Sequence, residues 1–139
     1  MDENRFLRDV AERLACDRER AEAVTFAVFR ELHDRLTPKE RGDVAAQLPT
    51  GLLHLWTEGP PGDRAPTRIR AEEFVGRIRR FAVLPDDREA ERAVRAVFSE
   101  LQRLLGSATG LEGEAWDVFS VLPKELKKLW LSAHEAVAE

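Results

Sequence analysis

The sequence predicts an all-α protein in which two pseudo-symmetric four-helix repeats pack together as one helical bundle. Two observations carry this prediction. Apolar residues recur at spacings of three and four along most of the chain, and blocks of sequence from the first half return in the same order in the second. No segment alternates apolar and polar residues with the period of two that is typical of a strand. With 139 residues, of which 43% are hydrophobic, the chain is long enough to form one domain with its own core.

Three blocks of sequence carry the duplication. Their offset grows from 68 to 74 residues through short insertions, and their order is kept. The matched blocks are Phe6-Leu7…Val10 with Phe74-Val75…Ile78, Ala27-Val28-Phe29…Leu32 with Ala96-Val97-Phe98…Leu101, and Asp43-Val44…Leu48-Pro49…Leu55-Trp56 with Asp117-Val118…Leu122-Pro123…Leu129-Trp130.

Residues 1–57 form repeat one, with four expected helices. The first covers about residues 3–14, and Asp17 is expected to cap the N-terminus of a long second helix. Thr37-Pro38 marks the start of the third helix, because a threonine hydroxyl accepts hydrogen bonds from free backbone N–H groups and proline suits the first turn. The residue before a proline avoids the α region, so the third helix ends before Pro49, which opens the fourth.

Residues 70–139 form repeat two and follow a connector at residues 58–69 that is rich in proline and glycine and does not suit a helix. Neither repeat is long enough to bury its apolar stripes alone, so we expect a shared core and one globular unit. The helices expected in repeat two cover about residues 70–82, 86–105, 112–121 and 123–136.

Composition excludes several classes of protein. Cys16 is the only cysteine, so a disulfide scaffold and a zinc ribbon are excluded; the thiol is either a small buried side chain or, if it faces the second helix, a reactive thiolate. No apolar run approaches the roughly 20 residues that span a bilayer, and the charged N-terminus does not resemble a signal peptide. We therefore expect a cytoplasmic protein that does not enter membranes.

Motifs that carry chemistry are missing from the sequence. His33, His54 and His134 have no second histidine or cysteine at the spacing of one helix face, and no glycine-rich phosphate loop or nucleophile turn occurs. We therefore expect no enzyme, and no catalytic, cofactor-binding or metal-binding residues. The net charge of −4 disfavours a nucleic-acid partner, and the single arginine cluster is better explained as a solvated face. That cluster comprises Arg68, Arg70, Arg77, Arg79 and Arg80.

Asp43 and Asp117 stand at matching positions of the two repeats, each beside a valine. One interpretation is a symmetric pair of carboxylates that face each other between the repeats. The alternative is that each carboxylate hydrogen-bonds backbone N–H groups near a helix end or pairs with an arginine.

Phe26, Phe29 and His33 are the candidate partner-binding residues. At 100° per residue they lie on the flank of the second helix that faces away from its apolar stripe. Repeat two has Arg95 and Gln102 at the places of Phe26 and His33. Three hypotheses remain for Phe26: it docks on the other repeat, forms a homodimer contact, or is exposed. Trp116 has no counterpart in repeat one and is freer to be exposed than the other tryptophans.

The duplicated unit, with Ala45-Ala46-Gln47-Leu48-Pro49 before a leucine-rich helix, resembles a bacterial and archaeal family known as domain of unknown function 2267. The resemblance covers nearly the whole chain, although repeat two keeps only the Leu-Pro of this block. It implies a helical fold and brings no activity or site residues.

The hypotheses for the function rest on the absence of catalytic, metal-binding and phosphate-binding motifs from the sequence. The hypothesis is a non-catalytic cytosolic helical interaction or scaffold module with a protein partner or a second copy. The rival is a small-ligand-binding protein or enzyme with a pocket between the repeats. A filled interior with an apolar patch outside favours the first hypothesis, and a closed apolar groove with converging polar groups favours the second.

Overall fold

The computed structural model describes residues 3–57, 71–106, 111–122 and 124–133. The connector at 58–69, the loop at 107–110, Pro123 and His134 lie outside these residues. Within the described ranges the chain forms helices and turns and no strands, as predicted. The helices are α1 (Glu3–Leu14), α2 (Arg18–Arg35), α3 (Pro38–Gln47), α4 (Thr50–Thr57), α5 (Ala71–Phe81), α6 (Asp87–Leu104), α7 (Glu114–Val121) and α8 (Lys124–Ser132).

The predicted N-caps are confirmed. Oδ1 of Asp17 accepts a hydrogen bond from the backbone N–H of Arg20 at 2.8 Å, and Oγ1 of Thr37 accepts one from Glu40 at 3.3 Å. Pro38 occupies the first turn of α3. Because these side chains satisfy N–H groups that a helix leaves unpaired, the chain determines these helix starts locally.

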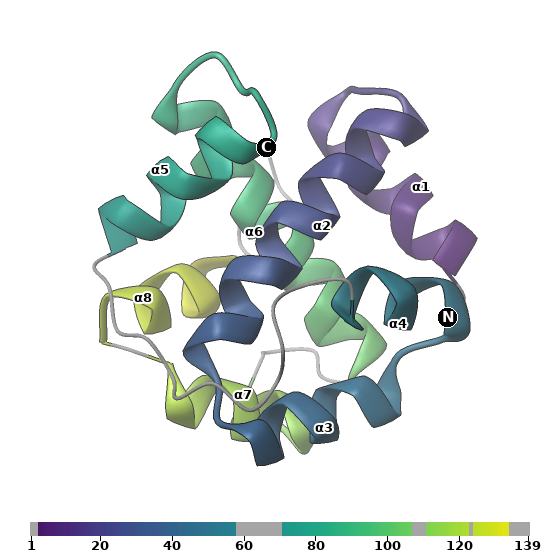
Figure 1. Cartoon of the computed structure of the whole chain (residues 1–139), viewed down its shortest axis with the longest axis vertical. Coiled ribbons are helices and arrows are strands. Elements are labelled where there is room, and N and C mark those ends of the chain that lie inside the picture. The colour runs from purple at the N-terminus through teal and green to yellow at the C-terminus, as the bar shows by residue number, and fades with distance from the viewer. Residues whose placement is uncertain (1–2, 58–70, 107–110, 123, 134–139) are drawn as a thin grey trace.

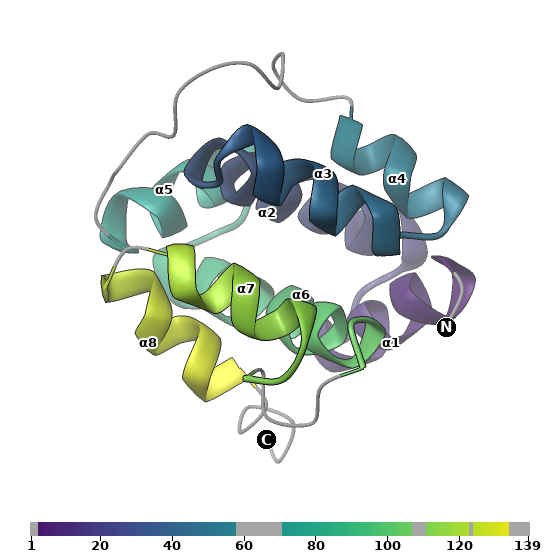
Figure 2. The ribbon, with the colours of Figure 1, turned by 90° about the horizontal axis from the view of Figure 1, so that it is seen from below.

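The two long helices, α2 and α6, run through the middle of the molecule (Figure 1). Each packs against the first helix of the opposite half: α1 lies against both α2 and α6, and α5 lies against both α6 and α2. Helices α3 and α7 lie side by side below them (Figure 2). The halves therefore interleave, and one continuous hydrophobic cluster contains residues from both.

Matching aromatic clusters fill the core of each half. In the first, the ring of Phe29 lies 6.0 Å from Phe6 and 5.5 Å from Trp56 between centroids. In the second, Phe98 lies 6.2 Å from Phe74 and 5.1 Å from Trp130. All six side chains are at most 1% exposed.

No helix among the described ranges combines the length and the apolar character needed to cross a membrane.

Candidate functional site

The expected outward orientation of Phe29 and His33 is wrong. Phe29 is fully buried, and His33 is 6% exposed with its ring 5.2 Å from that of Trp56. The guanidinium Nε of Arg41 donates a hydrogen bond to the carbonyl of His33 at 2.7 Å. The reason is that α2 is enclosed by α1, α4, α5 and α6, so the flank opposite its apolar stripe is also covered. Neither side chain is accessible to a partner.

Phe26 docks on the second half of the chain, the first of the three hypotheses. Its half-buried ring meets Phe81 of α5 edge to face, with 5.5 Å between centroids. The guanidinium carbon of Arg30 lies 5.0 Å from the centroid of the same Phe81 ring. Arg20 reinforces this contact, because its two terminal nitrogens donate to the carbonyls of Ala82 and Val83 at 2.8 Å each.

The structure brings together the two helices that carry Asp43 and Asp117, since α3 packs on α7. Asp43 is half-buried, whereas Asp117 is exposed. The proposed pairing of the two carboxylates stays a prediction, and an exposed aspartate favours a surface role on α7.

Two buried glutamates were missed by the sequence analysis. Glu31 on α2 accepts a hydrogen bond from Arg35 at 3.1 Å and lies 4.0 Å from Arg77 of α5. Glu100 on α6 pairs with Arg13 of α1 and, at 3.5 Å, with Arg103. Each glutamate therefore faces the first helix of the opposite half.

Burial raises the pKa of both carboxyls above the ordinary value for glutamate, and the arginine partners offset part of this shift. A signal for both residues exists in the sequence, because Glu31 and Glu100 each follow the matched phenylalanine by two positions. A glutamate repeated inside a hydrophobic block marks a buried, paired charge.

An exposed aromatic surface lies on α7 and α8. Trp116 is 48% exposed, which confirms its expected freedom, and its ring lies 5.5 Å from that of Phe119. Nζ of Lys127 stands 5.3 Å from the centroid of Phe119, and Leu111 before α7 is 37% exposed. We call Leu111, Trp116, Phe119 and Lys127 the α7 surface.

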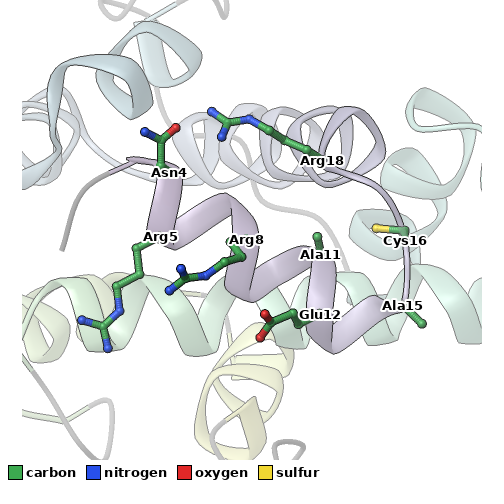
Figure 3. A pocket seen from close by; sticks show the side chains of 8 residues that line it. All are labelled: Asn4, Arg5, Arg8, Ala11, Glu12, Ala15, Cys16 and Arg18. Atoms are coloured by element: carbon green, nitrogen blue, oxygen red, sulfur yellow. The ribbon is translucent and has the colours of Figure 1, made fainter.

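A second feature is a groove of about 770 Å³ along the outer side of α1 (Figure 3). Cys16 stands at its end; burial, and then the charge of Asp17, raises the pKa of the thiol, so this environment does not favour a reactive thiolate. The groove lies on one flank of the molecule, not between the halves. It is lined by Asn4, Arg5, Arg8, Ala11, Glu12, Ala15, Cys16 and Arg18.

The remaining candidates for chemistry stay apart. His54 is exposed on α4, and no group of three metal-ligating side chains forms among the described residues. In the arginine cluster, Arg77 faces Glu31, and Nε of Arg79 lies 2.7 Å from Asp87.

A comparison with known families matches most of the chain. Residues 3–129 match the model of a family described as an uncharacterized conserved protein (DUF2267). The chain belongs to this family. The match begins with α1 and extends into α8, so it covers both halves of the helical bundle. No curated protein matches the chain.

Proposed function

We propose that this DUF2267 chain is a small, cytosolic, non-catalytic interaction module whose α7 surface docks a protein partner. The exposure of Trp116 carries the proposal. The other two tryptophans are at most 1% exposed, and the core of the described residues is filled with aromatic and aliphatic side chains. Trp116 therefore lies outside the core and is available for binding.

Tryptophan is among the residues that dominate binding energy at protein interfaces, and here its ring packs at a tilt against that of Phe119. Such a pair offers a large apolar area at low cost in side-chain entropy, because both rings already hold each other in place. The arrangement supports a docking role for α7 over a role in stabilising the fold.

The charge beside the aromatic pair indicates the kind of partner. Lys124, Lys127 and Lys128 belong to α8 and are three of the four lysines in the chain; Lys124 and Lys128 are exposed, as are the carboxylates of Glu112 and Asp117 before and within α7. An amphipathic helix with an apolar stripe and an acidic edge fits this surface, since its stripe covers the rings while its carboxylates meet the lysines.

The rival hypothesis, a ligand pocket between the repeats, has less support. The large groove of the described residues lies on the outer side of α1 and is lined mainly by arginine and small side chains. Asp43 and Asp117, which that hypothesis uses as converging polar groups, do not line it.

The test compares partner capture by three forms of the protein: wild type, Trp116→Ala, and Val83→Ala as a control that shortens an apolar side chain 76% exposed between α5 and α6. Proteins bound from native lysate are quantified by mass spectrometry. We expect one protein bound in stoichiometric amounts by wild type and control, and at least tenfold less by Trp116→Ala.

A second readout tests the contact directly. Since Trp56 and Trp130 are buried, quenching of tryptophan fluorescence by acrylamide reports mainly on Trp116. The identified partner should protect this fluorescence, and Lys127→Glu should weaken binding through charge repulsion. Equal capture by wild type and Trp116→Ala, together with unprotected fluorescence, would refute the proposal.

A further inference from the structure

Two surfaces at matching places in the two repeats carry opposite charge. On the first, Arg5, Arg8 and Arg18 line the groove of α1 together with Asn4 and, closer to Ala15, the carboxylate of Glu12; we call Asn4, Arg5, Arg8 and Arg18 the basic face. On the second, three carboxylates and two apolar side chains line a notch of about 150 Å³ between α5, α6 and α8. We define the acidic face as Glu72, Glu73, Asp87 and Glu91.

The charge is reversed at three matched positions, whereas Arg8 corresponds to Gly76 and Glu91 to Glu22. With the offset of 68 that relates the first blocks, Arg5 of α1 corresponds to Glu73 of α5. With the offset of 69 that relates the second blocks, Arg18 at the start of α2 corresponds to Asp87 at the start of α6. The reversal continues at the other end of the first helices, where Glu12 corresponds to Arg80.

These charges are accessible. The side chains of Arg5 and Arg8 are 53% and 64% exposed, and that of Asp87 is 72% exposed. Local pairing neutralises the faces only in part. The carboxylate of Asp9 lies 3.9 Å from Arg5 and 3.8 Å from Arg8. On the acidic face, Asp87 pairs with Arg79 at 2.7 Å and Glu91 with Arg95 at 2.8 Å, while Glu72 and Glu73 are exposed. Exposed pairs of this kind are worth little and exchange readily for better ones.

The shape of the notch suits an arginine. Its apolar lining comes from Val75 and Leu129, which are 6% and 8% exposed, and its carboxylates come from Glu72, Asp87 and Glu91. An arginine has the complementary build, with an apolar stem that packs on such a floor and a guanidinium that binds carboxylates with two parallel hydrogen bonds.

We propose that copies of this chain associate head to tail, the basic face of one copy docking on the acidic face of the next. Helices α1 and α5 lie on opposite flanks of the molecule, so the two faces cannot meet within one chain (Figure 1). Because the two joined surfaces differ, the contact is heterologous. A pair of docked copies therefore still has one basic face and one acidic face unoccupied. The assembly grows beyond a dimer into a ring or filament. This contact is separate from the α7 surface and does not depend on the proposed function.

The test uses two variants of the full chain that change exposed side chains without adding charge of the wrong sign. The basic-face variant carries Arg5→Gln, Arg8→Gln and Arg18→Gln. The acidic-face variant carries Glu72→Gln, Glu73→Gln and Asp87→Asn. A control carries Lys39→Gln, Arg88→Gln and Lys128→Gln, exposed positions outside both faces, and lowers the net charge by the same three units as the basic-face variant.

Molar mass is measured by light scattering and sedimentation over a range of protein concentrations, at about 20 mM and about 500 mM salt, which differ strongly in charge screening. At low salt the average mass of wild type and control should rise with concentration beyond twice the mass of the chain, and at high salt it should fall to that of the monomer. Each face variant alone should remain monomeric. An equal mixture of the two variants should form dimers and nothing larger. The basic-face variant keeps only its acidic face and the acidic-face variant keeps only its basic face, so one contact is possible in each pair.

Three results would each overturn the proposal: a wild type that stays monomeric at low salt, a face variant that associates like the control, or a mixture that does not form dimers. Partner capture through Trp116 is unaffected by all three, so failure here is distinguishable from failure of the proposed function.

Discussion

The contact between Phe26 and Phe81 offers the sharpest test of how the two halves are joined. It links α2 to α5 of the opposite half at 5.5 Å between ring centroids, and Arg30 stacks on the same Phe81 ring. An edge-to-face aromatic pair contributes about 0.5–1.5 kcal/mol beyond the area that it buries. Half-burial of a phenylalanine side chain adds about 1–1.5 kcal/mol. We expect Phe26→Ala to lower the free energy of unfolding by about 1.5–3 kcal/mol.

The measurement is a double-mutant cycle in urea with Phe26→Ala, Phe81→Ala and the double variant, at high salt so that association between copies is screened. The two substitutions should be coupled by about 0.5–1.5 kcal/mol. Leu131→Ala on α8 provides the control, and its effect should add to that of Phe26→Ala without coupling.

Molar mass distinguishes this contact from one between copies. All variants should remain monomeric under these conditions, because the partner ring belongs to the same chain. A coupling energy below about 0.3 kcal/mol, or Phe26→Ala that changes mass while leaving stability intact, would refute docking of the halves through these rings.

Three further substitutions test the core, the buried charges and a strained turn. Leu48→Ala should cost about 2–5 kcal/mol in urea unfolding, because the side chain is only 8% exposed; a loss below about 0.5 kcal/mol would contradict its place in the core. Since burial raises the pKa of Glu31 and Glu100 in the folded state, the stability linked to their protonation is fully present below the unfolded pKa and is lost as pH rises through the folded pKa. In Glu31→Gln or Glu100→Gln, the urea concentration at the unfolding midpoint should therefore decrease less steeply than in wild type as pH rises above about 4.3. An unchanged dependence of the midpoint on pH would count against this linkage. Val83 is 76% exposed with a φ of 54°, so Val83→Gly should raise the melting temperature by relieving about 1 kcal/mol of strain, and Ala15→Gly at a φ of 52° should gain less because alanine is not β-branched. A lower melting temperature for Val83→Gly would show that the turn is not strained.

The reversed charges can be read from the sequence, whereas their position on the surface and the positive φ of Val83 come from the structure. The sequence matches Arg5 with Glu73, but only the fold places these residues on outer flanks, beside a groove and a notch. Likewise, the duplicated blocks predicted an apolar stripe in each half. The contacts between helices show that the long helix of each half packs against the first helix of the other half.

The sequence by itself determined the helical character of the described residues and the starts of α2 and α3, because capping side chains and prolines act on the nearest backbone and need no distant partner. It also determined most of the core, since apolar residues at helical spacing must be covered by some neighbour. The tertiary structure alone decided how many neighbours each helix has. A hydrophobic stripe predicts one covered face, whereas α2 is enclosed by four helices, and this buried Phe29, His33 and Glu31 on faces that the periodicity assigns to solvent. Burial on those faces follows from the packing of elements far apart in the chain, so the helical periodicity does not encode it; only the repetition of the glutamate in both halves indicates it.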